Sequence, residues 1–161
     1  MADFFVASLG RDENALDWSQ LVAFSASQPR SAWTVPEAFV AILFAAATCD
    51  GELAGEEHDA LLALVHRSRA LKTLNKTQLA DVNATVVARL RDNPKALKQA
   101  CAALPQDMRL PVFAHALDLA LADGELREEE ADFMNTLILE LGVDGRDVER
   151  IADVIVLKNR Y

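Results

Sequence analysis

The stretches Asp50-Gly-Glu-Leu-Ala-Gly-Glu-Glu57 and Asp123-Gly-Glu-Leu-Arg-Glu-Glu-Glu130 share the form Asp-Gly-Glu-Leu-x-x-Glu-Glu and lie 73 residues apart. We call them the first and second acidic corners. Each follows an apolar run and precedes a second helical pattern. Their surroundings also match at the same offset, in the pairs Ala41 and Ala114, Ala47 and Ala120, Asp59 and Asp132, and Leu64 and Leu137. The sequence therefore predicts an internal duplication of a helix–corner–helix unit, with repeats at about 35–70 and 106–141.

The composition predicts an all-α protein. Ala, Leu, Glu and Asp recur throughout, whereas the six glycines and five prolines fall almost entirely at segment ends. A chain of 161 residues is long enough for one domain with a sizeable core. We expect a compact single-domain bundle of seven or eight helices, made of an N-terminal helical arm at 1–33 and a helical domain at 34–161.

Two central helices are expected within this bundle. Thr34-Val-Pro-Glu37 has the form of a capping box, and the helix that it opens is apolar nearly all round as far as Cys49. A helix without a polar face is normally buried. The second central helix is expected to begin near Gln106, and its segment from Val112 to Ala122 is similarly apolar. Further helices are expected at about 61–70, 75–91, 94–104 and 128–141. Gly142 ends the helix at 128–141, and Asp144 caps a final helix after it.

Each corner has a predicted mechanical role. Its glycine adopts the left-handed conformation that ends the first helix, and its leucine (Leu53 or Leu126) points inward. Glu57 and Glu130 then fall in the first turn of the next helix, so several carboxylates meet at one tight turn. Such an oxygen-rich, thiol-free cluster suits a hard divalent cation, Ca²⁺ or Mg²⁺. The spacing also matches the second half of an EF-hand loop, but the first half is absent.

A purely structural interpretation stands beside the metal site. Acidic residues stabilise a helix N-terminus and glycine commonly follows a helix, so the corners can be charged turns only. Against this, Ala54 and Arg127 occupy the expected N-cap positions and are poor caps. Three or four repelling acids also exceed what a helix start needs. The motif alone leaves both interpretations open.

With two such corners, the second followed by Leu141-Gly142-Val143-Asp144 and a final helix, the chain resembles the TerB family of tellurite-resistance proteins from about Val35 to Val154. The resemblance implies an all-helical stress-response protein that lacks an established catalytic activity and binds metal ions through these acids. By position, the implied site acids are Asp50, Glu57, Asp123 and Glu130, with Glu56 and Glu129 as secondary candidates. Ala54 and Arg127 depart from the family pattern, and Arg127 would oppose a cation nearby.

Other candidate residues favour ordinary structural roles. His115 and Asp118 share one face of a buried helix, which is typical of a satisfied core histidine. Cys49 and Cys101 form no CxxC pair and indicate reduced core thiols. No nucleophile and base occur together, so we expect no enzyme; a metal-assisted hydrolase is the least favoured function.

Charge is distributed unevenly along the chain. The net charge is −9, yet the basic segment 66–98 carries +6. The acidic remainder argues against nucleic-acid binding, and the basic segment indicates a solvated face or a docking surface for an acidic protein or an anionic membrane surface. No transmembrane segment is expected, and the chain is expected to be cytoplasmic. Two functions remain: a cation-binding stress-response protein, or a protein-interaction scaffold with purely structural corners.

Overall fold

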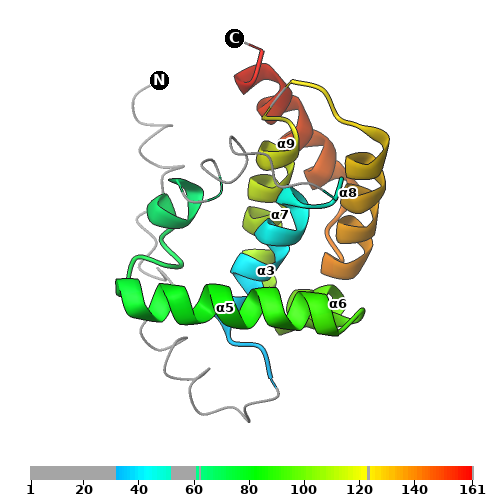
Figure 1. Ribbon diagram of the computed structural model, residues 1–161. Coiled ribbons are helices and arrows are strands. Elements are labelled where there is room, and N and C mark those ends of the chain that lie inside the picture. Colours follow the sequence, from blue (N-terminus) through cyan, green and yellow to red (C-terminus); the bar gives the residue numbers. More distant parts are fainter. Residues whose placement is uncertain (1–31, 52–60, 62, 123, 161) are drawn as a thin grey trace.

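The computed structural model describes residues 32–51, 61, 63–122 and 124–160. Every regular element within these residues is a helix, which confirms the all-α prediction. The helices are α3 (Val35–Ala47), α5 (Lys76–Asp92), α6 (Ala96–Ala103), α7 (Gln106–Ala120), α8 (Glu128–Leu141) and α9 (Gly145–Lys158), as shown in Figure 1. Residues 61 and 63–67 are also helical. The predicted arm at 1–33 lies outside the described residues except at its last two positions.

Helix α3 begins at the predicted capping box. The Glu37 amide donates to Thr34 Oγ1 at 3.3 Å, and the Thr34 amide donates to Glu37 Oε2 at 3.0 Å. Each side chain therefore satisfies a backbone group that the first helical turn leaves without a partner. A second box of the same form opens α5, where Asn75 and Gln78 exchange the same pair of bonds at 2.9 Å.

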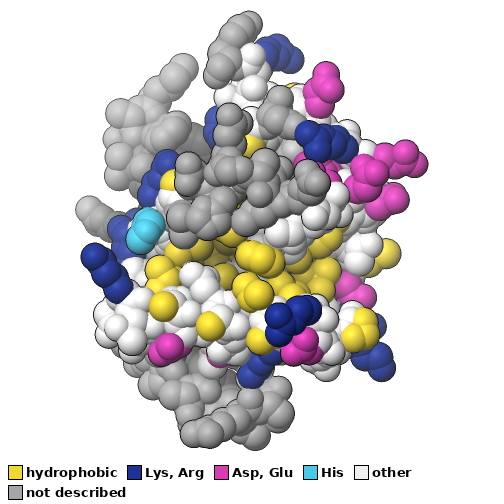
Figure 2. Space-filling view, in the orientation of Figure 1, with side chains coloured by type: hydrophobic (Ala, Val, Ile, Leu, Met, Phe, Trp, Pro, Cys, Tyr) yellow, Lys and Arg dark blue, Asp and Glu magenta, His cyan; other side chains and the backbone are white. Residues whose placement is uncertain are grey.

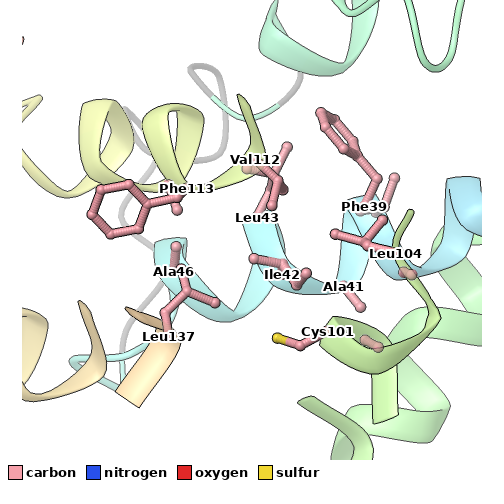
Figure 3. Close-up of a cluster of buried hydrophobic side chains, with 14 of the residues drawn as sticks. Phe39, Ala41, Ile42, Leu43, Ala46, Cys101, Leu104, Val112, Phe113 and Leu137 are labelled. Carbon is pink, nitrogen blue, oxygen red and sulfur yellow. The ribbon is translucent and has the colours of Figure 1, made fainter. Parts of the chain in front are cut away.

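The core is built around α3, which is buried on nearly all sides. Ten of its 13 residues are buried, and it packs against α5, α6 and α7. Figure 3 shows side chains of α3, α6, α7 and α8 meeting at its centre, among them the fully buried Ile42, Phe113 and Leu137. A helix without a polar face is stable only when neighbours cover it, so α3 fixes where the other helices lie.

Arg109, near the start of α7, forms hydrogen bonds at the C-terminal ends of α6 and α8. Its Nη1 donates to the Leu141 carbonyl at 3.1 Å, and its Nε donates to the Leu104 carbonyl at 3.4 Å. A cation is favourable at these positions because the last carbonyls of a helix carry its negative dipole end. The chain leaves α8 through Gly142, which has the predicted left-handed conformation with φ 62°.

Seven of the eight Lys and Arg residues of the basic segment 66–98 are exposed, and only Arg89 is partly buried. The Arg89 guanidinium turns inward: it donates to the Ala32 carbonyl at 3.2 Å, lies 3.6 Å from Glu37 and covers the Trp33 ring at 4.8 Å. Arg91 pairs with Asp92 and Lys98 with Glu140. Arg91 and Lys98 are exposed despite these ion pairs, as are the other cations of the segment: Arg67, Arg69, Lys72, Lys76 and Lys95.

Replacing Thr34 tests the cap that starts the central helix. Thr34→Ala should lower the free energy of unfolding by about 1 kcal/mol, because the Glu37 amide loses its acceptor. The measurement is urea denaturation followed by circular dichroism. Thr73→Ala, at an exposed turn position, is the control and should change stability by less than about 0.5 kcal/mol. Equal effects of the two substitutions would contradict the capping role.

Candidate acidic site

The two acidic corners begin with the same backbone turn. Helix α3 ends at Ala47 and α7 ends at Ala120, which are matched positions. Gly51 has φ 90° and Gly124 has φ 89°, so both glycines adopt the predicted left-handed conformation. Their amides donate to the Thr48 and Leu121 carbonyls, each at 3.0 Å. This likeness agrees with a duplicated unit, but the duplication itself stays a prediction from the sequence.

Glu130 closes the second corner onto the start of α8. Arg127 holds the N-cap position, as expected, and its amide donates to Glu130 Oε2 at 2.7 Å. Glu130 is only 5% exposed. A carboxylate beside the N-terminus of a helix is stabilised by the helix dipole and by this charge-assisted bond. Glu130 therefore has a structural role at the helix start, whatever else it binds.

The Arg127 side chain joins the two corners. Its Nη1 donates to Asp50 Oδ2 at 2.9 Å, across 77 positions of sequence. The Arg127 side chain is 56% exposed and the Asp50 side chain 16%. Arg127 thus contacts Glu130 through its backbone and Asp50 through its guanidinium. The positive residue that departs from the family pattern lies between two of the predicted site acids.

The predicted site acids are only partly described. Asp50, Glu129 and Glu130 lie within the described residues, whereas Glu56, Glu57 and Asp123 lie outside them. Glu129 is exposed beside Glu128 and Glu125, and acidic side chains gather around the start of α8 in Figure 2. Among the described residues, no three His, Cys, Asp or Glu side chains are grouped as metal ligands. Oxygen donors for a hard cation are present at the corners, but Arg127 already neutralises one of them.

The inward orientation predicted for the corner leucines is wrong at Leu126. This side chain is 41% exposed, in the extended stretch just before the Arg127 N-cap. Among the described residues of this corner, the buried one is Glu130, whose carboxylate satisfies the Arg127 amide. Leu53 lies outside the described residues.

His115 and Asp118 have partners that the sequence pattern did not indicate. Asp118 accepts from Lys158 Nζ at 2.7 Å and from Asn159 Nδ2 at 3.1 Å, both at the end of α9. The His115 ring meets Phe39 edge-on at 6.0 Å. Burial lowers the pKa of His115 below its ordinary value of 6.5, and the nearby Asp118 carboxylate offsets this in part.

Both cysteines are free thiols, but only Cys101 lies in the core as predicted. Cys101 is fully buried, and burial, with a smaller contribution from Glu140, raises its pKa to about 12. It therefore stays protonated and acts as a small apolar side chain. Cys49 is only partly buried, and its Sγ contacts the Ala46 carbonyl at 3.2 Å.

A double-mutant cycle measures the bridge between the corners. Asp50→Asn, Arg127→Gln and the double variant should give a coupling energy of about 0.2–1 kcal/mol, because the pair is partly exposed. The free energies come from urea denaturation, and the coupling should shrink in high salt. Zero coupling at low salt would show that the ion pair does not hold the corners together.

The titration of His115 should be visible in the stability of the protein and in the NMR spectrum of the imidazole. The folded state binds the proton less readily than the unfolded chain, whose histidine pKa is near 6.5. The free energy of unfolding should therefore fall as pH drops through 6.5, and His115→Gln should lose this component. NMR of the imidazole, assigned by its absence in the variant, should give a pKa below 6.5. A higher value would contradict the buried, neutral ring.

A family model described as tellurite resistance protein TerB matches residues 36–153. No curated protein and no solved structure matches the chain. Among the described helices, none combines the length and apolar character that a bilayer span requires. The match covers most of the sequence, including both corners and the helices around them. The chain therefore belongs to the TerB family.

Proposed function

We propose that this TerB-family protein is a non-catalytic, cytoplasmic stress-response protein that binds Ca²⁺ or Mg²⁺ where its two acidic corners meet. The observation that carries the proposal is the 2.9 Å contact between Arg127 Nη1 and Asp50 Oδ2. It places Asp50 of the first corner beside Arg127 of the second corner, and we infer from this contact that the other acids of the two corners lie close by. Asp50 and Asp123 would lead the ligand set, with Glu57, Glu130, Glu56 and Glu129 around them.

In this proposal Arg127 is an internal counter-cation. Clustered carboxylates repel one another, and a guanidinium beside Asp50 reduces that repulsion while no metal is bound. A divalent cation would compete for the same carboxylate and release the guanidinium, which is already 56% exposed. On cation binding, the ion would replace the Arg127 side chain as the group that links the two corners. This exchange could report metal or oxyanion stress to a partner.

Calorimetric titration of chelator-treated protein with Ca²⁺, Mg²⁺ and Zn²⁺ tests the proposal. Asp50→Asn and Asp123→Asn should each weaken binding about tenfold or more, because each removes a carboxylate ligand. Arg127→Gln keeps the backbone amide and removes the competing charge, so it should tighten binding several-fold.

The matched controls are Asp153→Asn and Arg146→Gln, which remove one exposed charge of each sign on α9. Both should leave the affinity within about twofold of the wild type. No saturable binding at about 10 mM cation would reject the metal site. Equal effects of Arg127→Gln and Arg146→Gln would reject the role of Arg127 as a counter-cation.

The alternative is a protein-interaction scaffold whose corners are purely structural. It is favoured by the bonds that Arg127 already makes to Asp50 and Glu130, since both carboxylates have partners within the protein. Docking of an acidic protein or an anionic membrane surface would then use the exposed cations of segment 66–98. Under this alternative Asp50→Asn leaves partner binding intact, whereas reversing Arg67, Arg69 and Lys72 abolishes it.

A further inference from the structure

The lining of a cavity of about 710 Å³ includes neither Asp50 nor Arg127. The segment 63–70, helix α7 and the C-terminal end of α9, which can be located in Figure 1, supply its walls, and Phe39 of α3 contributes a ring. Sites for small organic molecules commonly have volumes of roughly 300–1,000 Å³. The size is therefore suited to a ligand of that class.

The walls combine apolar surface with a few polar groups. Leu64, Met108 and Leu119 give the cavity an apolar lining, and the His115 ring lies edge-on to Phe39 within it. Small-molecule sites typically have this composition, in which apolar walls provide affinity and a few polar groups fix orientation. Neutral His115 keeps both a donor and an acceptor nitrogen for that purpose.

The charges of the lining favour an anion. Three cationic and two anionic side chains line the cavity, in a protein whose overall charge is −9. Asp118 is already neutralised by Lys158 at 2.7 Å. Arg67 and Arg69 are exposed and make no ion pair with a described residue, so they outnumber the remaining Asp107 carboxylate by one. Among the described lining residues, one net positive charge is therefore left, on exposed arginines beside apolar walls.

We propose that this cavity binds a small organic monoanion with an apolar body, held by its hydrophobic walls and by Arg67 and Arg69. The apolar part would contact Leu64, Met108 and Phe39. The anionic group would lie near the two guanidinium groups, which bind carboxylate, sulfonate or phosphate oxygens through paired N–H donors. Among the described residues, the cavity lining shares no side chain with the proposed cation site, and its nearest approach in sequence is Ala122, which directly precedes Asp123.

Two fluorescent probes with the same ring system test the proposal on the full-length protein. 8-Anilinonaphthalene-1-sulfonate carries one negative charge, and N-phenyl-1-naphthylamine is its neutral counterpart. Both should bind saturably at one site, and the anionic probe should bind more tightly. Arg67→Gln/Arg69→Gln should weaken the anionic probe about tenfold and leave the neutral probe within about twofold. The control Lys72→Gln/Lys76→Gln changes two exposed cations outside the cavity and should affect neither probe.

Filling the cavity gives an independent test. Ala63→Phe places a ring at the wall and should weaken both probes about tenfold, whereas Ala102→Phe, exposed on α6, should not. Ala122→Phe, at an exposed lining position, replaces Ala63→Phe if that variant unfolds by circular dichroism. The proposal is overturned if neither probe binds saturably, if both bind equally, or if the control substitutions weaken binding as much as the cavity substitutions.

Discussion

The structure depends on the burial of α3 on nearly all sides. A helix of this composition would expose apolar surface on any face left open, so α5, α6 and α7 must all pack against it. Its N-terminus is fixed by the Thr34 and Glu37 box, and Arg89 covers the same end by contacting Glu37 and Trp33. Its C-terminus therefore has a defined position, and Asp50 follows three residues later at the edge of the core.

The acidic corners follow from this arrangement and from two left-handed glycines. Gly51 and Gly124 turn the chain sharply after α3 and α7, because glycine has no Cβ to oppose a positive φ. Asp50 then lies where the Arg127 guanidinium can reach it. Arg127 is a poor N-cap for α8, and Glu130 compensates by accepting its amide. The choice of arginine at this position is explained by the other corner, not by the helix that it begins.

The fold could be predicted largely from local patterns. Capping boxes at Thr34 and Asn75, the stop at Gly142 and the apolar run of α3 each act within a few residues, so the sequence carries their signal directly. Contacts between distant segments could not be predicted in this way. The bond from Arg127 to Asp50 spans 77 positions and that from Lys158 to Asp118 spans 40, and both need the packed core. Sequence reasoning identified Arg127 as a charge opposing a cation but not its partner. The corner pattern predicts an inward Leu126, whereas Leu126 is exposed and Glu130 is buried.

The central claim is that the corners share one site in which a divalent cation replaces Arg127 at Asp50. A crystal structure of the protein grown with millimolar Ca²⁺ tests it most directly. We expect a cation about 2.3–2.6 Å from a carboxylate oxygen of Asp50, with the Arg127 guanidinium moved away. A structure in which Arg127 stays on Asp50, with no cation at either corner at that concentration, would contradict it.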